Sequence, residues 1–134
     1  MDFHLHERLA ADTVEVTRWP LCRVLLMNDA AYPWLILVPE RPDISEVFQL
    51  SAADQHLLMD ETSAAAAALQ RLFAADKMNI GALGNVVPQL HVHVIARHRT
   101  DPAWPRPVWG LAAALPYPPE ALAERLALLR SALG

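Results

Sequence analysis

The chain has 134 residues, of which 54% are hydrophobic and 19% charged, and this predicts one globular domain over residues 1–134 whose core needs no disulfides. The net charge of −4 argues against a sequence-independent nucleic-acid binder, and the apolar runs are too short to cross a membrane. The single Cys22 excludes an internal disulfide and a multi-thiolate zinc site, and the charged N-terminal residues, unlike a secretion signal, favour a cytoplasmic protein.

The first half of the chain predicts three strands and a long helix. The strands are short runs that are apolar throughout or alternate apolar with polar residues, and prolines or Asn28-Asp29 mark the turns after them. Ser51, with Asp54 three residues further on, has the form of a helix N-cap, and apolar residues follow at helical spacing over residues 51–75. The expected strands cover residues 14–18, 21–27 and 34–38.

The second half predicts two more strands, an ordered loop and a final helix. Residues 78–83 suit a short strand, and residues 90–96 form the clearest strand of the chain. Residues 99–118 are rich in proline and hold two of the four tryptophans, which predicts a loop rather than a regular element. Pro118-Pro119 then opens a helix with leucines along one face.

Residues 89–95, QLHVHVI, place polar side chains at alternating positions of an apolar run. Because successive side chains of a strand point to opposite faces, the aliphatic residues should face a core while Gln89, His91 and His93 share the other face. Such a row suits metal binding, nucleophilic and proton-transfer chemistry, or a solvated sheet surface. The preceding residues 79–88, NIGALGNVVP, offer glycine amides and asparagine donors to an anion, although Gly-Asn is also a common hairpin turn.

These segments resemble the histidine triad (HIT) superfamily, and in particular a bacterial branch described as diadenosine tetraphosphate hydrolase-like. The likeness covers nearly the whole chain and includes MNDAAYPWLILVP, PQLHVHVIAR and DPAWP. It implies an α+β fold with a five-stranded antiparallel sheet and two main helices, often paired into a homodimer. It also implies a nucleotide-binding hydrolase or transferase that acts at the α-phosphate of a nucleotide conjugate, a scheme that demands no metal or other cofactor.

The resemblance assigns roles residue by residue. His91 matches the middle histidine, the nucleophile that forms a covalent nucleotidyl-histidine, and His93 matches the third, which lies near the leaving atom. Gln89 stands where the family has its first histidine. The resemblance further implies ribose contacts from Asn28 or Asp29 and phosphate contacts from Asn79, Gly84 and Asn85.

The chemistry of imidazole is compatible with these roles. A neutral histidine, with an ordinary pKa of about 6.5, is a usable nucleophile at neutral pH. A backbone carbonyl could hold the other nitrogen of His91, and a protonated His93 could assist the leaving group. Two alternatives are a nucleotide-binding module without catalysis and a metal site in which His98 joins the pair. Trp104 and Trp109 are expected as loop anchors or dimer contacts more than as pocket walls.

Overall fold

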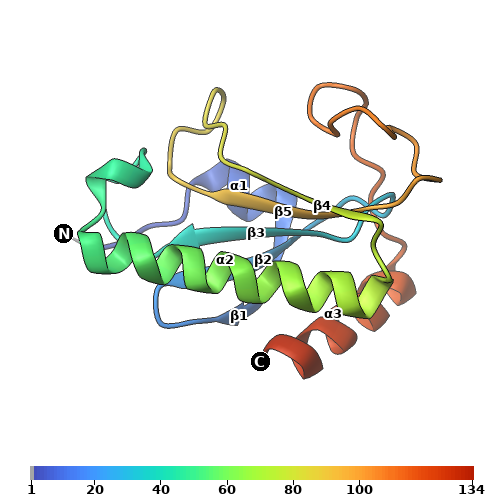
Figure 1. Ribbon diagram of the computed structural model, residues 1–134, viewed down its shortest axis with the longest axis horizontal. Helices are drawn as coiled ribbons and strands as arrows, with labels where there is room; N and C mark the ends of the chain where they lie inside the picture. Colours follow the sequence, from blue (N-terminus) through green and yellow to red (C-terminus); the bar gives the residue numbers. More distant parts are fainter. Residues whose placement is uncertain (1) are drawn as a thin grey trace.

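The computed structural model describes residues 2–134, and a five-stranded antiparallel sheet forms its centre (Figure 1). The strands are β1 (Thr13–Arg18), β2 (Cys22–Met27), β3 (Trp34–Pro39), β4 (Lys77–Gly81) and β5 (Val92–Arg97). They are ordered β1-β2-β3-β5-β4, and every neighbouring pair is antiparallel. With the two main helices, α2 (Ala52–Phe73) and α3 (Pro119–Leu133), this confirms the α+β fold. None of the helices in residues 2–134 is long and apolar enough to cross a bilayer.

Helix α2 begins where the sequence predicts. The Ser51 hydroxyl accepts a hydrogen bond from the Asp54 backbone N–H at 3.1 Å, which satisfies one of the free amides of the first turn. The helix ends at Phe73, and the φ of 49° at its C-cap residue, Ala74, lies in the left-handed region. Apolar residues of α2, among them Leu58 and Leu69, pack with α3 against one face of the sheet, along which α2 runs in Figure 1.

A buried carboxylate joins α2 to the start of β2. Glu61 is only 6% exposed, and its two oxygens accept hydrogen bonds from the backbone N–H groups of Leu21 at 3.0 Å and Cys22 at 2.8 Å. The Cys22 side chain is fully buried, as the sequence indicated. Burial raises the pKa of its thiol, and the nearby Glu61 charge raises it further, so Cys22 is an unreactive core residue.

The other face of the sheet is covered by short and irregular segments. The N-terminal residues, helix α1 (Glu7–Asp12) and the loop between β5 and α3 form a second apolar cluster with this face. All six residues of β3 are consequently buried. The sequence did not predict α1 or the 3-10 helix η1 (Val47–Gln49), because elements of six and three residues are too short to show a helical period.

Candidate active site

The histidine motif leads into β5 and keeps the alternation of faces that its sequence predicts. Leu90, Val92 and Val94 are buried in the cluster beneath α2, whereas His91 and His93 face the second layer. The two imidazole rings lie with their centroids 4.9 Å apart. Their exposed fractions are only 7% and 8%, because loops and α1 cover this face. The pair therefore occupies a shielded pocket and not a solvated sheet surface.

The backbone fixes the tautomer of His91. Its Nδ1 lies 2.7 Å from the carbonyl oxygen of Gln89. Because a carbonyl only accepts hydrogen bonds, Nδ1 carries the proton and donates, and the lone pair of a neutral ring is then on Nε2. This is the backbone acceptor that the sequence reasoning expected, and it does not depend on which side chain stands at position 89.

A tryptophan fixes the tautomer of His93 in the opposite sense. The indole N–H of Trp34, which can only donate, lies 3.0 Å from His93 Nδ1, so the proton of the neutral ring is on Nε2. Burial disfavours the imidazolium, and the neighbouring His91 adds to this, so the pKa of His93 is lowered to about 4. The expectation of a protonated His93 is therefore corrected: at neutral pH this residue offers an Nε2–H donor and no positive charge.

The histidines line a cavity of about 570 Å³, a volume in the usual range for small-molecule sites. One wall comes from α1, one from the loop after β4, and one from the loop before α3. Three of the predicted substrate-binding residues, Asp29, Gly84 and Asn85, line the same cavity. Other lining residues include Arg8, Leu9, Asp12, Met27, Trp34, Ile36, Leu83, Val86, Val108, Trp109, Leu111 and Leu115.

Asp29 lines this cavity, and backbone amides hold its carboxylate. It is 6% exposed, and its Oδ1 accepts hydrogen bonds from the backbone N–H groups of Ala31 at 3.0 Å and Leu115 at 3.4 Å. No hydrogen bond from residues 2–134 reaches the second oxygen, Oδ2. The carboxylate is therefore fixed by one oxygen and leaves the other available to a ligand.

Gly81, the last residue of β4, and Gly84, in the loop after it, have separate structural roles. Gly84 has a φ of 74°, a left-handed conformation that strains other residues, and it shapes the loop that carries Asn85. Gly81 lies under Trp109, where an added Cβ would come within 3.2 Å of the indole Cη2. Trp109 in turn packs edge-on against His93, with ring centroids 5.4 Å apart. Trp109 thus anchors its loop on the sheet and also forms a wall of the pocket.

A buried ion pair supports the loop that carries Trp109. Arg97 is 1% exposed, and its Nε donates to Asp101 Oδ2 at 2.7 Å. Burial alone would raise the pKa of Asp101, but hydrogen bonds from Arg97 and from the His98 and Trp104 amides outweigh it and lower the pKa to about 2. The Trp104 ring lies 5.7 Å from the Arg97 guanidinium, so Trp104 is the loop anchor that the sequence suggested.

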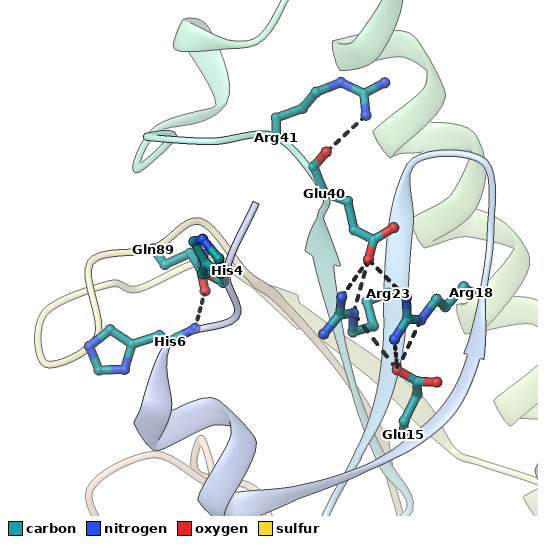
Figure 2. Close-up of polar contacts among 8 residues, drawn as sticks. All are labelled: His4, His6, Glu15, Arg18, Arg23, Glu40, Arg41 and Gln89. Atoms are coloured by element: carbon teal, nitrogen blue, oxygen red, sulfur yellow. Dashed lines mark hydrogen bonds and ion pairs between the residues drawn. The ribbon is translucent and has the colours of Figure 1, made fainter. Parts of the chain in front are cut away.

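Three predicted site residues lie outside this cavity. The Oδ1 atom of Asn28 accepts from the Tyr117 backbone N–H at 2.9 Å, and Oδ1 of Asn79 accepts from Arg97 at 2.8 Å. Gln89 turns its amide toward the N-terminal segment, between His4 and His6 (Figure 2). The structure therefore corrects the expectation that Asn79 and Gln89 share a pocket with the histidines, and of the two alternatives Asn28 and Asp29 it places Asp29 in the pocket.

The site also contains residues that the sequence did not predict to lie in it. The wall formed by α1 came from a helix that was not predicted. The resemblance placed Trp34 or Leu35 behind the histidines, and strand pairing selects Trp34, because Ile36 pairs with His93 and Trp34 lies two residues away on the same face. His98 does not join the other two histidines, since its Nε2 lies 2.8 Å from the Phe73 carbonyl oxygen. Within residues 2–134, no group of three or more His, Cys, Asp or Glu side chains could hold a metal ion.

The fold and site define a class of protein. The HIT domain family model matches residues 8–100, well over half of the chain, and the chain belongs to this family. Comparison with curated proteins gave no match.

Solved structures of histidine triad proteins are similar over essentially the whole chain. One from Bradyrhizobium japonicum is 46% identical with a TM-score of 0.97, and the match covers 100% of both chains. One from Sinorhizobium meliloti is 51% identical with a TM-score of 0.94, covering 98% of this chain and 97% of that one. One from Marinobacter aquaeolei is 50% identical with a TM-score of 0.97, covering 99% and 97%.

Proposed function

We propose that this protein is a hydrolase or transferase that acts at the α-phosphate of a nucleotide conjugate through a covalent nucleotidyl-histidine at His91. One observation carries the proposal. The Gln89 carbonyl holds Nδ1–H of His91, which leaves the Nε2 lone pair free in a cavity of about 570 Å³ that His93 also lines. A nucleophile held by a fixed partner beside a hydrogen-bond donor is the arrangement that covalent phosphoryl transfer needs.

The proposed reaction has two steps, formation of the nucleotidyl-histidine and its hydrolysis. In the first, the Nε2 lone pair of His91 forms a bond to phosphorus while the bond from phosphorus to the leaving atom breaks, and its electron pair goes to the leaving group. In the second, water attacks phosphorus, the P–Nε2 bond breaks, and neutral His91 returns. The proton that water loses balances the one that the leaving group takes up. The Nε2–H of His93 contributes by hydrogen bonding to the phosphoryl or leaving atom, because a neutral imidazole donates that hydrogen bond without giving up its proton.

The remaining polar groups of the cavity suit a nucleoside monophosphate. The free Oδ2 of Asp29 can accept hydrogen bonds from ribose hydroxyls. Backbone amides near Gly84 and the Asn85 side chain can donate to phosphate oxygens. Leu9, Met27 and the other apolar lining residues offer a surface for the base.

The charged residues of the cavity indicate which charge the leaving group carries. Among the described lining residues Arg8 is the one Lys or Arg, and it lies 3.5 Å from the Asp12 carboxylate, while Asp29 adds a second negative charge. The other exposed lining residues include the apolar Leu83 and Leu111. A polyphosphate leaving group would meet no cluster of cations there. We therefore favour conjugates with an uncharged or cationic leaving group, such as nucleoside phosphoramidates, over dinucleoside polyphosphates.

Turnover of two classes of nucleotide conjugate tests the proposal. Adenosine phosphoramidates with apolar amines and dinucleoside polyphosphates would be compared, with and without chelator, and the protein would be quenched during turnover to trap an acid-labile nucleotidyl-histidine. We expect faster turnover of the phosphoramidates, no effect of chelator, and a label on His91. Nucleotide binding without turnover or label would favour the binding-module alternative, and loss of activity with chelator would favour a metal site.

We also propose a homodimer. Strand β4 is an edge of the sheet, and Ile80 on it is 51% exposed. An edge strand with unpaired backbone groups and an exposed aliphatic side chain is a natural place for a second copy to add. Sedimentation of the wild type and of Ile80→Lys tests this, with a dimer expected for the first and a monomer for the second; a monomeric wild type would contradict it.

A further inference from the structure

We propose that Gln89 is a positioning residue whose side chain clasps the N-terminal segment and so holds one wall of the nucleotide pocket; the inference rests on the function proposed above. Gln89 Nε2 donates to the His4 carbonyl oxygen at 2.8 Å, and Gln89 Oε1 accepts from the His6 backbone N–H at 2.8 Å. Figure 2 shows the Gln89 amide facing this segment. We call these two hydrogen bonds the N-terminal clasp.

The chemistry of the clasp is specific to a primary amide. The His4 carbonyl and the His6 N–H flank Leu5, and one planar group reaches both of them, so they point to the same side of the segment. A primary amide carries a hydrogen-bond donor and an acceptor on the same carbon. It can therefore pair with a backbone C=O and a backbone N–H at once, as an adjacent strand does in a β-sheet. A carboxylate could serve only the N–H, and an apolar side chain could serve neither. Glutamine at position 89 is thus matched to this peptide backbone.

The clasp acts where helix α1 begins. His6 is the N-cap of α1, and its carbonyl accepts the first-turn hydrogen bond from Ala10 N–H at 3.0 Å. A helix of six residues is too short to be stable without tertiary contacts. Arg8, Leu9 and Asp12 of α1 line the cavity. The contacts that fix the start of α1 therefore also fix this wall of the cavity.

The segment is also held by packing: Phe3 and Leu5 lie against the second apolar cluster. The Phe3 ring packs against the Arg23 guanidinium, with 5.2 Å between the guanidinium carbon and the ring centroid. Arg23 is itself paired with Glu40 at 2.8 Å, in the ion-pair group at the lower right of Figure 2. This contact anchors residue 3 to the sheet, whereas the hydrogen bonds within residues 2–134 that tie residues 4 and 6 to the motif with the nucleophile are those of the clasp.

Residue 89 therefore has two separable contacts. Its carbonyl orients His91, and any side chain at this position leaves that carbonyl in place. Its side chain holds the pocket wall. Loss of the amide should weaken nucleotide binding and leave the chemical step unchanged, which distinguishes positioning from a part in catalysis.

Gln89→Met tests the clasp, because methionine keeps the length and bulk of glutamine without either hydrogen bond. Gln89→Asn, which keeps the amide but is one methylene shorter, provides a second variant with unchanged polarity. Gln55→Met is the matched control, since Gln55 Nε2 donates to the Leu50 carbonyl at 3.0 Å near the start of α2. Hydrogen exchange of the α1 amides would be measured without nucleotide, and the Kd of adenosine monophosphate would be measured by calorimetry. The kcat and KM would be measured with a nucleotide conjugate that the wild type hydrolyses.

In both Gln89 variants we expect faster exchange of the α1 amides and a Kd and KM raised roughly tenfold, the effect of about one net hydrogen bond, with kcat within about twofold. The control should match the wild type. Unchanged α1 exchange, or faster exchange without a change in Kd, would overturn the inference, as would a lower kcat at constant KM. If the wild type bound no adenosine monophosphate, the proposed function would fall, and the exchange data would still decide whether the clasp holds α1.

Discussion

The state of His93 can be tested through the pH dependence of folding. In the folded protein its pKa is about 4, because burial and the neighbouring His91 disfavour the charged ring. In the unfolded chain the value returns to about 6.5. Between these two values the unfolded state binds more protons, so the stability contributed by neutral His93 is complete above pH 6.5 and is lost as the pH falls toward 4.

The size of the effect follows from proton linkage. At pH 7.5 the ring is neutral in both states and contributes almost nothing to the pH dependence. At pH 4.5 the unfolded ring is nearly all protonated while most of the folded ring is neutral, and the difference lowers the free energy of unfolding by about 2–3 kcal/mol. His93→Gln removes this titration, and glutamine can still accept the hydrogen bond from Trp34 through its oxygen.

Urea unfolding of both proteins at pH 7.5 and pH 4.5 provides the measurement. Titrating groups that do not contact His93 contribute equally to the two proteins, so the comparison isolates His93 together with its coupling to His91. We expect the wild type to lose about 2–3 kcal/mol more than His93→Gln over this interval. Equal losses would show that His93 titrates near its ordinary pKa and that neither burial nor the tryptophan contact holds it neutral.

Three further predictions concern the nucleophile, its neighbour and the buried ion pair. His91→Asn should still bind adenosine monophosphate while turnover falls by several powers of ten, because asparagine cannot form the nucleotidyl adduct; unchanged activity would end the enzyme proposal. Gln89→His should change kcat by no more than about tenfold, roughly 1.4 kcal/mol of barrier, because a backbone carbonyl holds His91, whereas a thousandfold rise would give the side chain a chemical role. Asp101→Asn should lower the free energy of unfolding by about 3–5 kcal/mol in urea titrations, because it leaves buried Arg97 without its counter-charge; a loss below about 1 kcal/mol would contradict this.

Sequence reasoning succeeded where local periodicity is strong. The alternation in the histidine motif placed Leu90 in the core and the histidines opposite, and the N-cap at Ser51 marked the start of α2. Strand β5 begins at Val92, two residues later than expected, because the Leu90 N–H bonds to the Ile44 carbonyl at 2.9 Å outside the sheet. Such a contact between distant segments leaves no trace in the local pattern.

Contacts between distant segments also explain why Asn79 and Gln89 do not lie in the pocket as expected. Asn79 pairs with Ile95 in the sheet and lies on the expected face, but Arg97 occupies its oxygen. Gln89 also has the expected position in the chain, yet its partners are more than 80 residues away at His4 and His6. Periodicity predicts which face a side chain occupies, whereas the choice of partner on that face depends on which loops fold over it.

The buried thiol of Cys22 gives this chain a chemical probe of its own folding. Its sulfur is inaccessible and has a raised pKa, so alkylating reagents should label it only when β2 separates from α2 and Glu61 releases the two amides that it holds. The rate of thiol labelling in the unmodified protein then measures how often this core opens, at a single site and without an engineered label. Since the histidine-lined pocket is on the opposite face of the sheet, labelling would distinguish opening of the core from motion of the pocket walls.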